Sequence, residues 1–302
     1  MTSAPPKAKP TAKAGRIRIG ISGWRYPPWR GVFYPDKLTQ ARELEYASRA
    51  LPVIELNGSF YSLQTPERYA RWAEDTPAGF MFTVKAPRYI THIRRLDDPL
   101  EPMANFMASG LFELGPKLGA ILWQFPPGMR FDPEKFETFL ALLPHTAAQA
   151  KALAKQRSSR MHGKESLEPG ARQKFRHAIE VRNDSFVDPA FIDMLRKYKA
   201  ALVVADTGGR WPEYEDLTAD FVYVRLHGAN ALYESGYAEK QLDDWARRIR
   251  SWAKGSQHRG AKLMSTTSAP KRAARDVFCF FDNTAKIAAP ANAQRLREKL
   301  KA

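Results

Sequence analysis

Polar side chains stand two positions apart in three stretches that are otherwise apolar. The pairs are Glu55 with Asn57, Glu180 with Arg182, and Arg225 with His227. Residues two apart point to the same face of a β-strand, so each pair would project from one face of a strand whose other face is apolar. A carboxylate near an imidazole is a general acid–base pair. Our candidate catalytic residues are therefore Glu55, Glu180 and His227.

Further polar residues end other apolar stretches and extend the candidate site. Lys85, Gln124, Asp206 and Asn283 stand at such ends, and His92 follows Lys85 closely. Lysine and arginine bind phosphate and carboxylate groups. The predicted substrate-binding residues are Asn57, Lys85, His92, Gln124, Arg182, Asp206, Arg225 and Asn283.

A divalent metal is an alternative use of the same carboxylates. Glu55, Glu180, Asp206 and His227 together form a ligand set suited to Mn²⁺, Mg²⁺ or Zn²⁺. The neighbouring cationic side chains disfavour a highly charged ion, so we predict no metal and no other cofactor. The sequence also contains no phosphate-binding loop and no dinucleotide-binding fingerprint.

These side chains can form one site only if the fold brings the ends of several strands together. The alternation of predicted strands and helices along the chain indicates such a fold. Strands are predicted at 17–22, 53–57, 80–85, 119–124, 177–182, 201–206, 221–227 and 276–282. Helical spacing occurs at around 39–50, 66–75, 99–115, 133–143, 189–199, 239–253 and 290–301, and the connection at 206–220 shows none. Such alternation indicates a parallel sheet, and eight strands indicate an α/β protein with a single (β/α)8 TIM-type barrel.

The barrel would gather the polar groups at one mouth. One parity of each strand faces the helices and the other faces the barrel interior. The polar strand ends then converge at the carboxyl-terminal mouth, where barrel enzymes keep their active sites. Asp206 is the ambiguous case, because it shares its parity with the apolar Val204.

The net charge of +16 is concentrated in the segments 1–18, 151–176 and 254–275, which together carry +17. We predict a disordered basic tail at 1–14 and one domain at 15–302, with basic insertions at about 151–176 and 254–275. These insertions contain few large apolar groups, so we expect them to be solvated and to add little to folding. Both connect a helix to a strand, which would place them at the amino-terminal face, away from the site.

The sequence composition also indicates which classes of binding partner to expect. No apolar run approaches the ~18 residues of a membrane span, and the N-terminus lacks the apolar core of a secretory signal. We therefore expect a cytoplasmic protein that does not bind membranes. The tail and insertions suit weak, non-specific nucleic-acid contact.

Several stretches resemble the YecE-like family, also called domain of unknown function 72. They are E-L-N-G-S-F-Y (55–61), K-A-P-R-Y-I-T-H-I-R-R-L (85–96), L-W-Q-F-P-P (122–127), F-V-Y-V-R-L-H-G (221–228) and F-F-D-N (280–283). The resemblance covers most of 17–300 apart from the two insertions. It implies a (β/α)8 barrel with a site at these strand ends, and it implies no reaction. This chain departs from the family pattern at 183–186, where the family has His and Trp.

Two hypotheses follow. The first is an enzyme that binds a small phosphate- or carboxylate-bearing substrate and acts on it by acid–base chemistry; hydrolase, isomerase and lyase remain open. This hypothesis rests on charge. Lys85, Arg182 and Arg225 end alternate strands, and Glu55 and Glu180 can neutralise only two of these three cations, so the remaining positive charge would bind an anion. The second is a nucleic-acid-binding protein, in one form a metal-dependent phosphodiester hydrolase.

Overall fold

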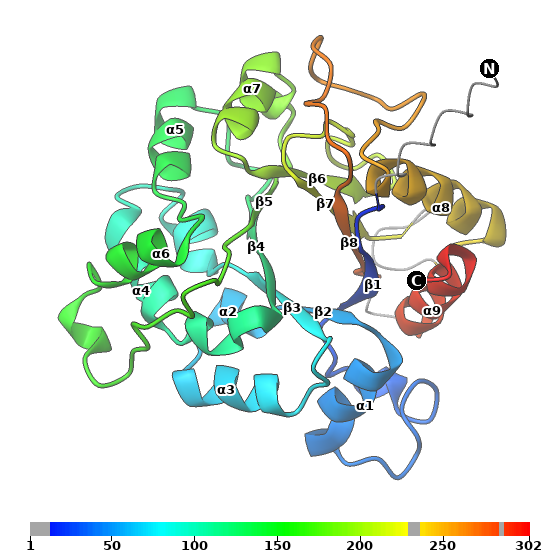
Figure 1. The fold of residues 1–302 in the computed structure, drawn as a ribbon, viewed down its shortest axis with the longest axis horizontal. Coiled ribbons are helices and arrows are strands. Elements are labelled where there is room, and N and C mark those ends of the chain that lie inside the picture. Colours follow the sequence, from blue (N-terminus) through cyan, green and yellow to red (C-terminus); the bar gives the residue numbers. More distant parts are fainter. Residues whose placement is uncertain (1–12, 229–235, 284–286) are drawn as a thin grey trace, which may run out of the picture.

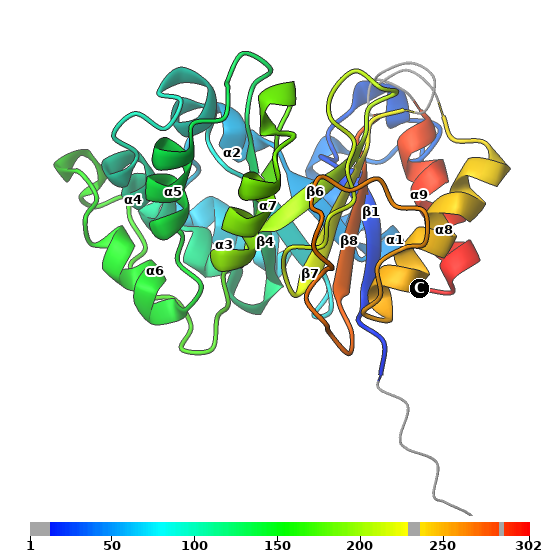
Figure 2. The same ribbon diagram turned by 90° about the horizontal axis from the view of Figure 1, so that it is seen from above.

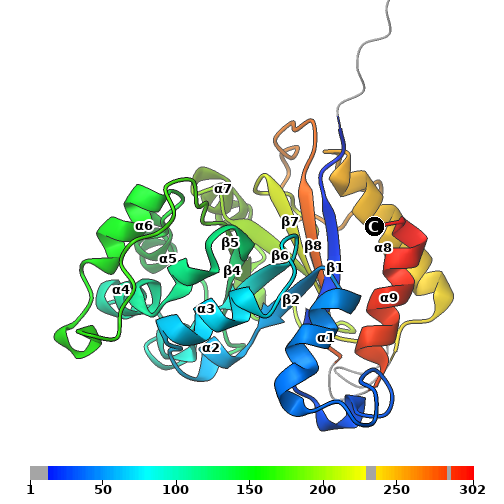
Figure 3. The same ribbon diagram turned by 60° about the horizontal axis from the view of Figure 1, so that its bottom comes forward.

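The structure, a computed structural model, describes residues 13–228, 236–283 and 287–302 of the 302-residue chain. Most of the predicted tail at 1–14 lies outside the described residues. Parallel strands β1 to β8 pair in chain order and close into a barrel surrounded by helices (Figures 1 and 3). The predicted TIM-type barrel is confirmed.

The strands lie where their apolar alternation predicts them. They are β1 Ile17–Ser22, β2 Val53–Leu56, β3 Met81–Lys85, β4 Leu118–Gln124, β5 His177–Glu180, β6 Ala201–Asp206, β7 Phe221–Leu226 and β8 Asp276–Phe281. Their inward side chains form a packed core below the mouth, which includes Leu122, Phe221, Phe278 and Phe280. The barrel interior is therefore filled, and polar chemistry is confined to its ends.

The helices form the outer layer. The α-helices are α1 Glu43–Ala50, α2 Gly58–Tyr61, α3 Pro66–Glu74, α4 Leu100–Ala108, α5 Pro133–Ala141, α6 Ala147–Ala154, α7 Pro189–Lys197, α8 Glu239–Ala253 and α9 Ala288–Leu300. Helices α3, α5 and α7 begin with a proline after a capping side chain, which are Thr65, Asp132 and Asp188. As predicted, no helix occurs between β6 and β7, a connection that lies wholly within the described residues.

The first insertion is packed, contrary to our expectation. Its first residues belong to α6, and its Phe175 is 1% exposed. It runs back along α4: the backbone N–H of Ser158 bonds to Asn105 Oδ1 at 2.8 Å, and that of Ser166 bonds to the carbonyl of Ala108 at 2.8 Å. Part of the insertion therefore packs against α4, while other residues of it, such as Lys155, His162 and Arg172, are exposed.

The second insertion takes the place of the absent helix between β6 and β7. The backbone N–H groups of Met264 and Ser265 bond to the Asp216 carboxylate at 2.7 and 3.0 Å. The guanidinium of Arg275 is buried and donates to the carbonyl of Ala219 at 3.2 Å. Figures 1 and 2 show this segment (orange) outside β6 and β7. The expectation that it is solvated is wrong at these residues.

Candidate functional site

Arg225 lies at the centre of the carboxyl-terminal mouth. Its guanidinium, 1% exposed, donates to Glu180 Oε2 at 2.7 Å, to Glu55 Oε1 at 2.9 Å and to Asp282 Oδ2 at 2.7 Å. A further bond joins Arg225 Nε to Glu55 Oε2 at 3.1 Å. The three carboxylates come from β2, β5 and the end of β8, so the cluster ties distant parts of the barrel together.

Hydroxyl groups complete the surroundings of Glu55. Tyr223 Oη donates to Glu55 Oε2 at 2.7 Å and contacts Thr83 Oγ1 at 2.8 Å. Ser22 Oγ bonds to the other oxygen of Glu55, and Asn57 Nδ2 donates to Ser22 Oγ at 3.3 Å. Glu55 is thus fixed on both oxygens and 0% exposed. It has no open face toward a ligand.

Glu180 is held as an anion. Burial alone would raise the pKa of its carboxyl, but the charges of Arg182 and Arg225 lower that pKa well below its usual range. Burial would also raise the pKa of Asp282, but the charge of Arg225 outweighs burial and lowers that pKa. Glu180 is therefore a base or a fixed charge at neutral pH, and not a proton donor.

His227 lies behind Arg225 and is fully buried. Its Nε2 is 3.4 Å from Arg225 Nη1, and its Nδ1 is 3.0 Å from Asp282 Oδ2. A guanidinium only donates hydrogen bonds, so Nε2 faces it as an acceptor and the ring proton belongs on Nδ1. His227 thus serves the Arg225 cluster directly, which the sequence alone did not indicate.

Lys85 has a different environment. It ends β3, is only partly buried, and its ammonium lies 4.2 Å from the centre of the Phe60 ring. Within the part of the chain that the structure describes, its Nζ has no hydrogen bond and no ion pair. Burial and the charge of Arg225 lower the pKa of Lys85 to about 8. Roughly one molecule in ten then carries a neutral amine at pH 7.

Arg182 and His92 lie at the rim. Arg182 donates to Glu180 Oε1 at 2.7 Å, and its guanidinium stacks 3.9 Å from the ring centre of Trp211. His92 meets the Phe60 ring edge-on with centroids 5.0 Å apart, and its Nδ1 lies 2.8 Å from Thr91 Oγ1. Burial, with Lys85 and Arg182 nearby, lowers the pKa of His92 to about 4. His92 is therefore neutral at pH 7.

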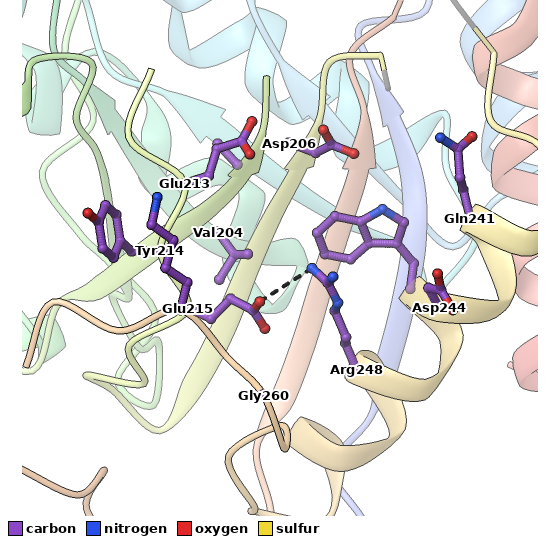
Figure 4. A pocket seen from close by; sticks show the side chains of 12 residues that line it. Val204, Asp206, Glu213, Tyr214, Glu215, Gln241, Asp244, Arg248 and Gly260 are labelled. Atoms are coloured by element: carbon purple, nitrogen blue, oxygen red, sulfur yellow. Dashed lines mark ion pairs between the residues drawn. The ribbon is translucent and has the colours of Figure 1, made fainter. Parts of the chain in front are cut away.

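Asp206 does not join this site. The inward positions of β6 belong to Val203 and Ala205, and Asp206 points to the outer side, where it lines a cavity of about 370 Å³. Figure 4 shows it there with Glu213 and with the ion pair of Glu215 and Arg248, whose atoms are 3.3 Å apart. Burial raises the pKa of Asp206. The prediction that Asp206 binds substrate beside Arg225 is therefore not supported by its position.

The four residues considered as an alternative metal-ligand set do not come together. Asp206 is absent from it, and Glu55 and Glu180 both direct their oxygens to Arg225. Over residues 13–228, 236–283 and 287–302, no group of three or more His, Cys, Asp or Glu side chains is arranged to hold a metal ion.

The other predicted residues take different positions. Gln124 ends β4 on the inward side, paired with Glu180 in register, and is 5% exposed. Asn283 is fully buried one position beyond Asp282. The prediction omitted several residues of the cluster, which are Ser22, Thr83, Trp211, Tyr223 and Asp282. Of these, Tyr223 and Asp282 share the inward parity of Arg225 and of Phe280, a signal that was present in the sequence.

Two cavities flank the mouth, separated by α2. One of about 750 Å³ is lined by Asn57, Trp24 and Arg68. The other, of about 470 Å³, is lined by Phe60, Tyr61, Arg94 and Arg160. Arg160 belongs to the first insertion, so our expectation that both insertions lie away from the site is wrong for this residue.

Comparisons with known proteins agree with the fold. The family profile described as "Protein of unknown function DUF72" matches residues 18–302. The chain is 32% identical over 116 residues to UPF0759 protein YunF of Bacillus subtilis, which covers 37% of this chain and 40% of that protein. It is 30% identical over 113 residues to UPF0759 protein YecE of Escherichia coli K12, covering 36% and 38%. The chain thus spans about two fifths of the length of these relatives.

Solved structures resemble the chain over nearly its whole length. A DUF72 family protein from Thermotoga maritima has a TM-score of 0.70 at 23% identity, covering 95% of this chain and 100% of that one. A DUF72 family protein from Enterococcus faecalis has a TM-score of 0.63 at 20% identity, covering 95% and 96%. At these identities the likeness concerns the fold alone. Among the described residues, no helix has the length and apolar character needed to cross a membrane.

Proposed function

The chain belongs to the DUF72 family, which is defined without reference to a reaction, and from the geometry of its own mouth we propose that it binds a small phosphate- or carboxylate-bearing substrate. It acts on this substrate by acid–base chemistry at the carboxyl-terminal end of the strands. The observation that carries the proposal is the Lys85 ammonium, which reaches the mouth without a counterion within bonding distance among the described residues.

The charge balance of the mouth differs from the one expected from the sequence. Asp282 supplies a third carboxylate, so Arg225 is surrounded by anions and has no need of an external one. The three carboxylates match Lys85, Arg182 and Arg225 in number, but all of them bond arginines, so the Lys85 ammonium has no bonded counterion among the described residues. Arg182 lies at the same rim, where it and Lys85 both lower the pKa of His92. A substrate phosphate or carboxylate matches this pair in charge and in hydrogen-bonding capacity.

Differences in solvent accessibility support one residue of the mouth as the group that transfers protons. Glu55, Glu180 and His227 are 0%, 1% and 0% exposed and are engaged with Arg225 or its partners. Lys85 is partly exposed, and its pKa of about 8 allows it to give or take a proton near neutral pH. We therefore assign the proton-transfer role to Lys85, and to the three buried residues the role of fixing the charge around it.

Thermal melting with inorganic phosphate tests the binding step. The matched variants are Lys85→Gln at the mouth and Lys271→Gln on the exposed part of the second insertion, each of which removes one positive charge. We expect phosphate to stabilise wild type and Lys271→Gln alike, by about 2.7 kcal/mol at a hundredfold excess over its Kd. Lys85→Gln should lose most of this stabilisation. Equal protection of all three proteins would place the anion on the insertions, and would favour the nucleic-acid alternative.

A further inference from the structure

Two partly buried lysines of this chain differ in what their amines contact. Lys117 Nζ donates to the carbonyls of Ala73 and Thr76 at 2.5 and 2.6 Å and to Thr76 Oγ1 at 3.0 Å. These hydrogen bonds favour the charged ammonium form of Lys117 and point its N–H groups into the protein. Lys85 Nζ has no such bond among the described residues and contacts the face of Phe60 at 4.2 Å from the ring centre.

The groups around Lys85 keep it from forming an ion pair. The carboxylates of Glu55, Glu180 and Asp282 are directed to arginines, at distances of 2.7 to 3.1 Å. An amine in this position is near fixed cations, beside an aromatic face, and reachable from the mouth. These are the conditions under which a lysine becomes neutral and nucleophilic.

We propose that Lys85 is a covalent nucleophile that forms an imine with a small anionic carbonyl compound, of the 2-oxo acid or aldehyde-acid class. This inference rests on the proposed function, because the same mouth supplies the charge that binds the carboxylate. Arg182 holds the carboxylate of the substrate, and the carbonyl carbon meets Lys85 Nζ.

The covalent step balances without an external oxidant or reductant. The neutral amine attacks the carbonyl carbon, a C–N bond forms, and the carbonyl oxygen takes up a proton to give a carbinolamine. Nitrogen then gives up one proton and the hydroxyl group takes up one from solvent. The C–O bond breaks as the nitrogen lone pair forms the C=N bond, and water departs to leave the protonated imine. Glu180, which is held as an anion 2.7 Å from both Arg182 and Arg225, stabilises the protonated imine.

Reductive trapping tests the inference. The full-length protein is incubated with glyoxylate and cyanoborohydride, and modified lysines are located by peptide mass spectrometry. At pH 7 we expect labelling of Lys85 at least tenfold faster than that of Lys117 or of the exposed Lys37 in the same sample. The labelling rate should rise as pH passes through about 8, because the neutral amine then predominates, and level off above it. An exposed lysine should continue to gain reactivity up to about pH 10.4.

Two controls separate this inference from the proposed function. Lys85→Arg keeps the charge but forms no imine, and propionaldehyde offers a carbonyl without a carboxylate. If Lys85 is labelled no faster than Lys37 while phosphate still protects the wild type on melting, the imine is excluded and the proposed function stands. If propionaldehyde labels Lys85 as fast as glyoxylate does, the anionic substrate class is wrong. The wild-type comparison between peptides holds even if Lys85→Arg fails to fold.

Discussion

At the scale of single residues, Arg225 bonds the three carboxylates of the mouth, and Lys85 is the residue to which we assign the chemistry. Arg225 satisfies three buried carboxylates that would otherwise be unpaired charges in the barrel. Breaking a buried ion pair by removing one partner leaves an uncompensated charge, which costs much more than the net value of the pair. Arg225 is therefore a structural requirement of the site before it is a binding residue.

Arg225→Ala should lower the free energy of unfolding by roughly 3–5 kcal/mol, because Glu55, Glu180 and Asp282 then lose their common partner. Urea denaturation followed by circular dichroism measures this loss. Arg295→Ala is the matched control: its pair with Glu239 is about half exposed on both sides, and its removal should cost far less than that of Arg225 because solvent screens the pair. Equal losses for the two variants would show that the Arg225 cluster is not structural.

The alternation of inward and outward positions along the strands predicts many residues of this site, but not all of them. Alternation places Glu55, Glu180 and Arg225 on inward faces, where the structure has them. It gives Asp206 the outward parity of Val204, and both line the same outer cavity; the prediction placed Asp206 at the mouth because it is a polar residue that ends a strand. Alternation does not reveal that Asp282 neutralises Arg225, since ion-pair partners depend on the register around the whole barrel.

At the scale of elements, the connection between β6 and β7 departs most from a regular barrel. It contains no helix and is held by Glu213, whose Oε1 accepts from the backbone N–H of Thr207 at 2.6 Å and of Gly209 at 3.0 Å. This loop carries Trp211, which stacks on Arg182. One carboxylate therefore helps to position the aromatic ring at the rim of the site.

Glu213→Ala should release this loop while leaving the barrel intact. We expect amide hydrogen exchange at Thr207 and Gly209 to accelerate at least tenfold, because both N–H groups lose their acceptor. The strands on either side should keep their protection. Glu213→Gln retains an acceptor oxygen and should give a smaller change. Unchanged exchange in Glu213→Ala would mean that the loop is held by other contacts.

The elements themselves were largely predictable. All eight strands were expected within one or two residues of their observed bounds, because buried parallel strands are short, nearly continuous apolar runs, and these runs end in polar residues. Helix α6 was missed and its sequence assigned partly to an insertion, since A-A-Q-A-K-A-L-A contains one large apolar residue. The short α2 was missed because a four-residue helix leaves no periodic pattern.

At the scale of the whole molecule, the basic insertions belong to the folded body more than composition suggested. Arg275, counted among the basic residues of the second insertion, is 1% exposed and bonded to backbone carbonyls. Arg157 pairs with Glu165 at 2.5 Å, with both side chains mostly buried. Net charge read from a sequence therefore overstates the charge that these segments present to a polyanion.

The central claim is that a small anion binds at the mouth through Lys85. A crystal structure grown with phosphate, at a concentration that saturates the thermal stabilisation, tests it most directly. The account predicts density for phosphate within hydrogen-bond distance of Lys85 Nζ, about 3 Å, and beside the Arg182 guanidinium. Density confined to the insertions or to the cavity of Arg94 and Arg160, with none at Lys85, would contradict it.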